Sequence, residues 1–370
     1  MSRIDMAQIT RAMDDFGVDV LLAMSPENFF YLANSLNLSQ RIIPGRLCIA
    51  VFPRDGEPYA VVCYCEQQQT AQDSWIREIQ IYIEFKETPM QALARSLKER
   101  GLVASRLGIE KHFLAACHAE ELAVLLPEST QVAADGLFQK IRSIKTSAEI
   151  EILTEAATCT ERAILQTLQE ARPGHTEKEL ADQLSLRILR AGATSQWRIL
   201  ATGVNTAVNH PYAGSKRLTP GEVMRIDTGG TFQGYQSDVA RTAFVGTCSE
   251  RQETVYRYLR ETQEATINAA RPGARACDVF NTFKEALRER GLTPTSQAVG
   301  HGLGVGLHEF PILHAAETAF IEPGMVLNVE PAVKDAQGHL YHIEDLVLVT
   351  NHEPRTLTNL RDMQEPFIVE

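Results

Sequence analysis

The spacing of apolar residues divides the chain into two parts near residue 140. In the first part, short apolar runs bounded by turn residues alternate with stretches of helical spacing, a pattern typical of a sheet layered with helices. An Asp-Gly turn in PRDGEP (53–58) joins two of these runs into a predicted hairpin. The predicted strands are VDVLLAM (18–24), LCIAVF (47–52), YAVVCYC (59–65), IQIYIEF (79–85) and RLGIEK (106–111).

Helices are predicted between these strands. Ser25 is a candidate N-cap, because Pro26 follows it at the first helical position. Residues 1–140 are therefore expected to form an α/β domain, and they contain no glycine motif of the kind that cradles a nucleotide. The other helices of this part are predicted at Ile4–Phe16, Met90–Arg100, His118–Leu126 and Gly136–Ile141.

The second part, residues 141–370, begins with a long amphipathic helix and then becomes rich in strands. Thr146 or Ser147 is the candidate N-cap of that helix, and Glu149 in its first turn favours the helix dipole. A chain of 370 residues is long for one core, so two domains of mixed α/β (α+β) class are expected. Further helices are predicted at 177–192, 249–270 and 276–290.

Composition and charge limit which class of protein this is and which partners it is expected to bind. An apolar content of 44% with 22% charged residues describes a soluble globular protein. The net charge of −11 argues against a nucleic-acid partner, which requires clustered Lys and Arg. No apolar run approaches the roughly 20 residues that span a bilayer, so no membrane partner is expected.

Seven scattered cysteines and a charged N-terminal segment without a signal-peptide core favour a reducing cytoplasm. Cys63 and Cys65 lie two residues apart in YAVVCYC, so they are predicted to share one strand face. A zinc half-site and small core residues are the two interpretations of this pair, and core packing is favoured.

The stretch Met224–Arg241 holds two aspartates placed nearly symmetrically about a turn. Its turn-rich centre, which contains Gly229, Gly230 and Gly234, predicts a hairpin, because glycine adopts the φ > 0 conformations that turns require. Pairing of the two strands would bring Asp227 and Asp238 to one side of the ribbon. Two carboxylates that close repel unless they share a proton or hold a cation. A metal site and two solvated turn aspartates are the alternatives.

Two glutamates interrupt apolar strands further along the chain. Glu330 in MVLNVEPAV and Glu344 in YHIEDLVLVT flank a DAQG turn almost symmetrically. Carboxylates on buried strands are rare unless they are paired or bound to metal. A buried salt bridge to Arg225 or Arg241 is the structural alternative.

Three histidines accompany these acids. His301 and His308 lie seven residues apart in GHGLGVGLHEFP, whose glycines let backbone and imidazole approach a ligand closely. This spacing is poor for placing both on one metal, so the two are expected to divide the roles. An incidental surface loop and a phosphate-cradling loop are the alternatives, the latter weakened by the lack of Lys. His210 in GVNTAVNHPYAG would on its own be an ordinary loop residue.

Taken together, the acids and one histidine form an oxygen-rich ligand set. Structural zinc prefers Cys and His in a closed tetrahedron, so four carboxylates and one imidazole suit two divalent ions instead, with Mn, Co, Zn or Fe all compatible. Two such ions can hold a bridging water as hydroxide at neutral pH. The set is Asp227, Asp238, His301, Glu330 and Glu344.

These residues, with their flanking text HPYAG, RIDTGG, GYQSDVART, GHGLGVGLHE, NVEP and IEDLVLVT, resemble the pita-bread metallopeptidases. That family includes prolidase (Xaa-Pro dipeptidase), Xaa-Pro aminopeptidase and methionine aminopeptidase, with creatinase as a metal-free relative. The resemblance covers residues 148 to 365, while SPENFFYLAN and its hairpin resemble the creatinase-type N-terminal domain. The fourteen-residue gap between Glu330 and Glu344 is most similar to prolidase. The implied fold is a creatinase-like α/β domain followed by a pita-bread domain, a curved, mostly antiparallel sheet covered by helices.

The resemblance also implies how the ligands divide. Asp227 would chelate one metal through both oxygens, while Asp238 and Glu344 would bridge the pair. His301 and Glu330 would complete the second metal.

The remaining roles implied by the resemblance concern substrate and protons. His308 would hydrogen-bond the substrate carbonyl and the developing oxyanion, and His210 would line the pocket and position the scissile amide. Glu330 would pass a proton from the bridging water to the leaving nitrogen. The implied reaction is hydrolysis of an Xaa-Pro amide bond in dipeptides or short peptides, by a homodimer.

One position departs from the family pattern. Peptidases of this family commonly carry Arg in a run like R-I-E-D, but here the run is His342-Ile343-Glu344-Asp345. Arg is a permanently charged fork, whereas His titrates near neutrality. We interpret His342 as a substrate-binding residue that alters specificity, with a donor role to Asp238 or a neighbouring ligand as the alternative.

Three functions are therefore weighed. The leading one is a dinuclear-metal Xaa-Pro dipeptidase or aminopeptidase. The second is a metal-dependent hydrolase of a small non-peptide amide or ester, for which His342 and the unusual SQWRILATG segment are the hints. The third is an inactive binding protein or a metal-free creatinase-like amidinohydrolase. The presence of all five ligand side chains argues against the third.

Overall fold

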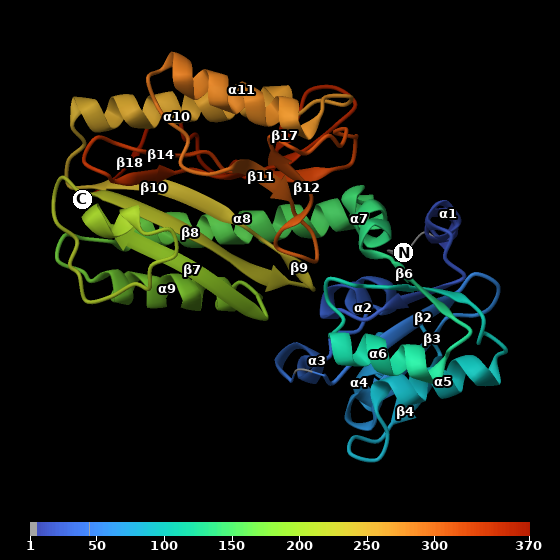
Figure 1. The fold of residues 1–370 in the computed structure, drawn as a ribbon. Coiled ribbons are helices and arrows are strands. Elements are labelled where there is room, and N and C mark those ends of the chain that lie inside the picture. Colours follow the sequence, from blue (N-terminus) through green and yellow to red (C-terminus); the bar gives the residue numbers. More distant parts are fainter. Residues whose placement is uncertain (1–5, 44) are drawn as a thin grey trace. The chain divides into compact units, whose positions relative to one another are not determined.

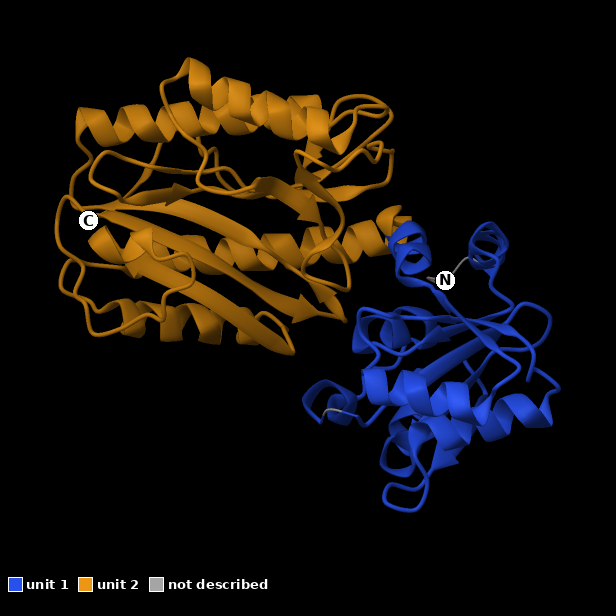
Figure 2. Cartoon of the chain, viewed as in Figure 1, with its two compact units in different colours: residues 1–142 blue, residues 143–370 orange. Residues whose placement is uncertain are grey.

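The computed structural model describes residues 6–43 and 45–370, which form two compact units (Figures 1 and 2). The first unit comprises residues 1–142 and the second residues 143–370. Each unit has its own buried apolar core, as expected for a chain of this length.

The first unit is built on a six-stranded mixed sheet in the order β4-β3-β2-β1-β5-β6. The central strands β1, β2 and β3 are antiparallel, and the outer strands β4, β5 and β6 run parallel to their inner neighbours. Apolar side chains of β1, β2 and β3 are fully buried because helices cover the sheet. The strands are β1 Val20–Ala23, β2 Ile49–Pro53, β3 Tyr59–Cys63, β4 Glu78–Tyr82, β5 Arg106–Ile109 and β6 Thr130–Ala133.

One helix of this unit begins where its predicted N-cap lies. The Ser25 side chain accepts a hydrogen bond from the Asn28 amide at 3.1 Å, with Pro26 at the first helical position. Of the helix predicted at Ile4–Phe16, residues 4 and 5 lie outside the described residues. The helices are α1 Met6–Phe16, α2 Pro26–Ala33, α3 Leu38–Ile42, η1 Tyr64–Glu66, α4 Gln67–Asp73, α5 Pro89–Glu99, α6 Ala116–Leu125 and α7 Asp135–Ser143.

Three predicted strands end two or more residues early, one of them at Ile109 instead of residue 111. The strand predicted to reach Phe85 ends at Tyr82, and Phe85 takes a left-handed φ of 68° with its side chain 99% exposed. The strand predicted to reach Cys65 ends at Cys63, where the chain turns into η1. Strand β6 was not predicted, because TQVA is short and only half apolar at an edge of the sheet.

The second unit pairs two helices with each of two sheets (Figure 1). Helices α8 (Ser147–Glu170) and α9 (Glu177–Arg190) pack on the sheet β18-β10-β8-β7. Helices α10 (Glu250–Ala269) and α11 (Ala276–Glu289) pack on the sheet β12-β11-β13-β16-β17. All pairings in these sheets are antiparallel except β10 with β18. The predicted class, an α/β domain followed by a mostly antiparallel sheet covered by helices, is confirmed.

The strands of the second unit fall into two halves of the chain, before and after residue 295, and β18 of the second half pairs with β10 of the first. The first half holds β7 Ser195–Thr202, β8 Val223–Phe232, β9 Tyr235–Gln236 and β10 Val239–Val245, with η2 Gly203–Ala207 after β7. The second half holds β11 Ala298–Gly302, β12 Glu309–His314, β13 Val326–Val329, β14 Ala332–Lys334, β15 Leu340–His342, β16 Asp345–Leu348, β17 Arg355–Thr356 and β18 Phe367–Val369.

Helix α8 begins with a reciprocal capping box, which decides between the two predicted N-caps. Thr146 accepts from the Glu149 amide, and the Glu149 carboxylate accepts from the Thr146 amide at 2.8 Å. Ser147 is therefore the first helical residue.

The hairpin of Met224–Arg241 forms, but Gly229 and Gly230 do not make its turn. Both lie inside β8, and the turn falls at Gln233 and Gly234, with φ of 49° and 86°. A Cβ on Gly229 would lie 1.8 Å from the Ser237 carbonyl oxygen. These glycines are therefore small so that two backbones can approach, not to supply a positive φ.

The two glutamate-bearing runs form two short pairs of strands instead of one continuous hairpin. Strand β13 pairs with β16, and β14 pairs with β15. Glu330 falls in the break between β13 and β14, and Glu344 in the break between β15 and β16. Each glutamate therefore leaves the regular ladder where the chain passes from one sheet to the other.

Candidate metal centre

Asp227 and Asp238 converge on one side of the first sheet. Asp227 lies in the middle of β8, opposite Ala240 of β10, and Asp238 immediately precedes β10. A carboxylate oxygen from each, with one from Glu344, forms a group whose atoms all lie within 4.8 Å of one another. Asp238 is 4% exposed and Glu344 1%. The pairing register thus gathers three carboxylates in a nearly dry site.

The second sheet brings His301 and Glu330 to the same place. His301 of β11 pairs with Asn328 of β13, two residues before Glu330. Ligand atoms of His301, Glu330 and Glu344 again lie within 4.8 Å of one another. The Asn328 amide donates to Glu344, which fixes that carboxylate from below. Glu344 therefore belongs to both groups.

Several polar atoms at this centre have no hydrogen-bond partner among the described residues, namely Asp238 Oδ1, Glu344 Oε2 and His301 Nε2. His301 Nε2 stands 3.8 Å from Asp238 Oδ2 and 3.6 Å from Glu330 Oε1, too far for a hydrogen bond. Its other nitrogen, Nδ1, lies 3.0 Å from the Gly302 carbonyl, an acceptor, so Nδ1 carries the proton and Nε2 keeps its lone pair. Buried lone pairs left bare in this way are suited to a cation.

The electrostatics of the centre lead to the same conclusion. Burial and the nearby carboxylates of Asp227 and Glu330 raise the pKa of Asp238 well above its usual range. Burial and Asp238 do the same to the pKa of Glu344. Burial lowers the pKa of His301. A divalent cation would neutralise the carboxylates and accept the imidazole, and this oxygen-rich set with one nitrogen fits such an ion.

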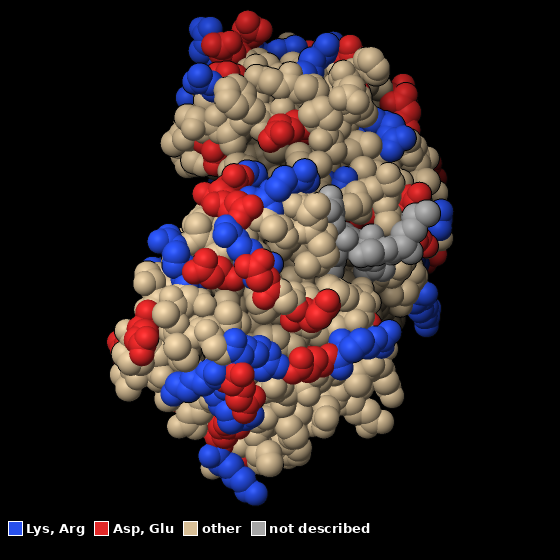
Figure 3. Space-filling view, turned by 90° about the vertical axis from the view of Figure 1, so that its right-hand side faces the viewer, with Lys and Arg blue, Asp and Glu red and all other residues tan. Residues whose placement is uncertain are grey.

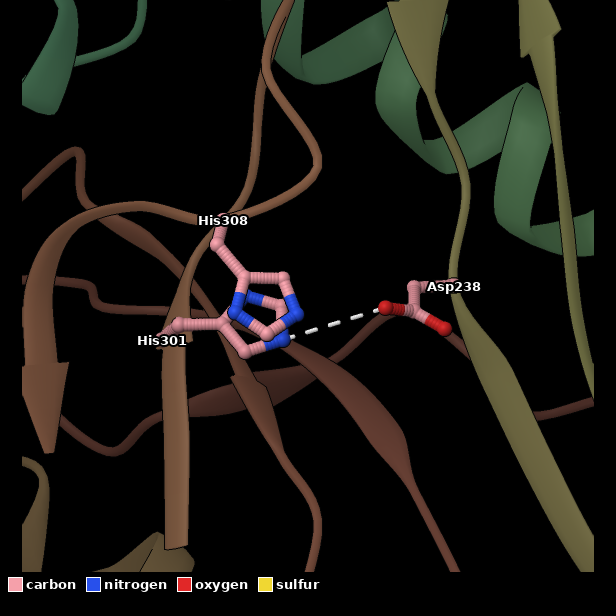
Figure 4. Close-up of side chains that lie close together, drawn as sticks. All are labelled: Asp238, His301 and His308. Atoms are coloured by element: carbon pink, nitrogen blue, oxygen red, sulfur yellow. Dashed lines mark ion pairs between the residues drawn. The ribbon is translucent and has the colours of Figure 1, made fainter. Parts of the chain in front are cut away.

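His308 lies against His301 at this centre. Its ring stacks on that of His301, with centroids 3.8 Å apart and planes at 14° (Figure 4). Figure 4 shows His301 on strand β11, His308 on the following loop, and Asp238 facing both imidazoles from the start of β10. A His308 nitrogen also comes within 4.8 Å of ligand atoms of Asp238 and His301. Unlike the other two side chains, His308 is exposed.

A buried ion pair fixes the loop that carries His308. Lys145 Nζ lies 3.2 Å from Glu309 Oε2, and both side chains are almost fully buried. Glu309 also accepts the Gly306 amide at 2.8 Å, which closes the loop on itself. Sequence reasoning missed this pair, because Lys145 and Glu309 are far apart in the chain and neither carries a motif of its own.

His342 lies beside the carboxylates and is absent from the described lining of the cleft. Its Nδ1 is 3.5 Å from Asp227 Oδ2, and its Nε2 is 3.6 Å from Glu330 Oε2. Burial disfavours the charged imidazole, but the two carboxylates outweigh burial and raise the pKa of His342 to about 10. His342 therefore faces two candidate ligands at distances longer than a hydrogen bond, and its contact with substrate stays a prediction.

A cleft of about 370 Å³ opens onto the carboxylates. His210 lines it from an exposed loop, which Arg225 fastens by donating to the carbonyls of Val208, at 3.1 Å, and Asn209. The predicted site residues on its wall are Asp227, Asp238, His210, His308, Glu330 and Glu344. The wall also holds side chains that sequence reasoning did not assign, Trp197, Ile199, Pro211, Tyr212 and Leu307.

The strand register explains part of that apolar wall. Ile199 of β7 pairs with Asp227 and Trp197 with Gly229, so both side chains share the face of the aspartate. Arg198 between them also lines the cleft, and its guanidinium meets Asp182 of α9 at 3.3 Å. The alternation in SQWRILATG was the available signal, but it could be read only once the strand's partner was known.

The predicted alternative of a salt bridge from the glutamates to Arg225 or Arg241 is not what forms. Arg241 pairs with Glu161 and with Asp345, at 2.5 and 3.0 Å, and all three are buried. Arg260 completes this network by pairing with Asp345 at 3.0 Å. Within the described residues, neither Arg225 nor Arg241 forms an ion pair with Glu330 or Glu344.

Each of the two units matches a known protein family. Residues 151–351 match the metallopeptidase family M24, and residues 6–144 match the creatinase/prolidase N-terminal domain. The Xaa-Pro dipeptidase of Pyrococcus furiosus is 31% identical over 227 residues, which cover 60% of this chain and 65% of that enzyme, less than two thirds of its length. A putative dipeptidase of Bacillus subtilis is 27% identical over 361 residues, 97% of this chain and 98% of that protein.

A solved structure resembles the chain over nearly its whole length. The Xaa-Pro dipeptidase from Bacillus anthracis is 26% identical and superposes with a TM-score of 0.86, covering 98% of each chain. Within the described residues, no helix is long and apolar enough to cross a membrane. On the face drawn in Figure 3, acidic and basic side chains intermingle over the described part, without a continuous basic surface.

Proposed function

Because the chain belongs to metallopeptidase family M24, we propose that it hydrolyses the Xaa-Pro amide bond of dipeptides or short peptides. The family match, the dipeptidase relatives and the matching dipeptidase structure support this reaction. The main observation behind this proposal is a set of buried ligand atoms without hydrogen-bond partners, on Asp238, His301 and Glu344. Asp238 and Glu344 also line the cleft.

We propose that the centre holds two divalent ions, Mn, Co, Zn or Fe. Two overlapping groups of ligand atoms share Glu344, as expected where one carboxylate serves two cations. Asp227 belongs to one group, His301 and Glu330 to the other, and Asp238 lies beside both His301 and Asp227. The proposed ligands are Asp227, Asp238, His301, Glu330 and Glu344.

The chemistry requires a nucleophile, a polarised carbonyl and a proton for the leaving amine. Bound divalent ions would supply a Lewis acid and an activated water. Glu330 borders the cleft and would take the proton of the attacking water and deliver it to the leaving nitrogen. His308, exposed above His301, would donate a hydrogen bond to the substrate carbonyl as negative charge develops there.

The rest of the cleft would hold the substrate in place. His210 would position the scissile amide, and Arg225 supports this role by fixing the loop that carries it. The apolar wall formed by Trp197 and Ile199 provides a surface for the ring of a proline or for the side chain before it.

We propose that His342 orients two ligands and does not itself contact substrate. Its nitrogens face Asp227 and Glu330, one from each side of the centre. An imidazole in that position would hold the two carboxylates in their ligating orientation. It takes the place of the arginine that stands in R-I-E-D runs.

Two further proposals concern the setting of the enzyme. We expect it to act in the cytoplasm, as the unpaired cysteines of the described chain support. We also expect a homodimer, which light scattering on the purified full-length protein would show as twice the mass of 41.1 kDa.

The test is hydrolysis by the Mn- or Co-loaded protein of Xaa-Pro dipeptides, of longer Xaa-Pro peptides, and of matched Xaa-Ala peptides as controls. We expect cleavage of the Xaa-Pro substrates and a marked preference over Xaa-Ala. Cleavage of dipeptides alone would identify a dipeptidase, and cleavage of longer peptides an aminopeptidase. If the metal-loaded protein cleaved neither, the peptidase proposal would fall, and a small non-peptide amide or ester would become the substrate class to examine.

A further inference from the structure

The thiols of Cys63 and Cys65 in the first unit are in contact, whereas a continuous strand through both residues would hold them apart. Residues i and i+2 of a continuous strand point to the same face but lie nearly 7 Å apart along it, at roughly 3.3 Å per residue. Here β3 ends at Cys63, and Tyr64–Glu66 form the 3-10 turn η1. The turn brings Cys65 Sγ within 3.3 Å of Cys63 Sγ.

The two thiols differ in access. Cys63 is fully buried, whereas Cys65 is exposed. A reagent in solution can therefore reach Cys65 but not Cys63, and Cys63 can reach only what is attached to Cys65. In a cysteine pair that reacts with disulfides, the accessible thiol attacks first and the buried thiol beside it resolves the mixed disulfide.

The geometry does not favour a metal ion at this cysteine pair. Within the described residues, the groups of three or more side chains that could hold a metal ion do not include these cysteines. The zinc half-site considered for this pair therefore has no third ligand nearby. The Arg46 guanidinium, which pairs with Glu84 at 2.6 Å, favours the thiolate of Cys65 but does not outweigh the burial that raises the pKa of Cys65.

We infer that Cys63 and Cys65 form a site of reversible thiol oxidation by small-molecule disulfides. The Cys65 thiolate attacks one sulfur of the disulfide RSSR, the S–S bond breaks, and RS⁻ leaves and takes up a proton. The Cys63 thiolate then attacks Cys65 Sγ and expels the second RS⁻. Two protein thiols are oxidised by two electrons to one disulfide, and RSSR is reduced to two RSH. A small thiol in excess reverses both steps.

The exchange is expected to be slow at neutral pH and faster in mild alkali. Burial and the hydrogen bond with Cys63 raise the pKa of Cys65, against the opposing effect of Arg46. Because the thiolate is the nucleophile, a raised pKa leaves less of it at neutrality.

The test is to incubate the full-length protein with oxidised glutathione in mild alkali, block remaining thiols with a maleimide, and analyse the peptide that contains both cysteines by mass spectrometry. In the wild type we expect this peptide to lose two hydrogens and to carry neither glutathione nor maleimide. Cys117, exposed on α6, is the internal control and should retain glutathione.

Two variants separate the roles of the thiols. Cys63→Ala should trap glutathione on Cys65, because no resolving thiol remains, and Cys63→Ser serves if the alanine variant folds poorly. Cys65→Ala should leave Cys63 without glutathione, and alkylated only after unfolding. Stable glutathione on wild-type Cys65, with Cys63 alkylatable after unfolding, would overturn the inference. So would an unmodified pair while Cys117 is modified.

Discussion

Two clusters of buried carboxylates lie side by side in the second unit, and they are neutralised in opposite ways. Glu344 and Asp345 are neighbours in the chain, yet each belongs to a different cluster. Asp345 meets Arg241 and Arg260, each at 3.0 Å, which hold the pKa of Asp345 below its usual range despite burial. Glu344 meets Asp238 and Asp227, and its pKa is raised.

The comparison distinguishes structural from functional buried charge. The Arg241 cluster is complete in charge, because Arg241 and Arg260 face the carboxylates of Glu161 and Asp345. Glu161 also accepts the Leu360 amide at 3.0 Å, and Thr358 donates to Asp345 at 2.7 Å. The Asp238 cluster carries an excess of anions with bare lone pairs. Burying a charge without a partner inside the protein costs free energy. A fold that contains such buried charges therefore indicates that a partner binds from solution.

The largest expected effect comes from removing a ligand at the incomplete cluster. Asp238→Asn keeps the shape of the side chain but removes a charge that the cations require. We expect activity to fall by about 10³-fold or more, equivalent to several kcal/mol of lost metal-assisted stabilisation. The measurement is kcat/KM on an Xaa-Pro dipeptide, with circular dichroism as the control for folding. Wild-type turnover by this variant would show that Asp238 is not a ligand.

The complete cluster should respond in stability instead. Arg241→Met leaves Glu161 and Asp345 with a buried charge uncompensated, and we expect a loss of about 3–5 kcal/mol in the free energy of unfolding. Urea unfolding measures it. The matched control is Arg198→Met, which breaks the exposed pair with Asp182 and should cost under about 1 kcal/mol. Equal losses in the two variants would mean that the buried network has no special role.

Metal removal should affect one unit and not the other. Divalent ion at 100 times its Kd stabilises a binding-competent fold by about 2.7 kcal/mol. For a unit of this size that corresponds to roughly 5–10 °C in Tm. We expect chelator to lower the melting transition of residues 143–370 and to leave that of residues 1–142 in place. Calorimetry of the wild type and Asp238→Asn checks this, since the variant, which should bind at most one ion, should respond less to chelator.

The smallest effect is expected at His342, which touches ligands but not the cleft. His342→Gln should weaken metal binding by about 10–100-fold, the usual cost of losing a group that orients ligands. Titration calorimetry measures the affinity directly, apart from activity. His342→Arg should retain the affinity because it restores a donor fork. If His342→Arg instead changed KM alone, the residue would act on substrate, as first predicted from the sequence.

The sequence alone predicted the fold class, which the structure confirms, and it drew attention to the stretches that carry the candidate ligands. Asp227 and Asp238 were predictable because a short hairpin fixes the distance between its own strands. The breaks at Glu330 and Glu344 were not, because they depend on how two sheets share a pair of strands. The same limit applies to Gly229, whose small size is required by the Ser237 backbone opposite it.

Contacts between distant segments could not be predicted at all. Lys145 with Glu309, and Arg241 with Glu161, are separated by 164 and 80 residues and leave no local pattern. His342 shows the difference most clearly. In the sequence, His342 stands out because it departs from the R-I-E-D run of the family. Only the fold shows that it lies between Asp227 and Glu330.

Elemental analysis of the full-length protein, loaded with Mn and freed of excess ion, tests the difference between the two clusters most directly. We predict two ions per chain in the wild type and at most one in Asp238→Asn. An Arg241→Lys variant, which keeps a cation in the complete cluster, should still bind two. Wild-type protein without stoichiometric metal, and without activity restored by Mn or Co, would contradict the account.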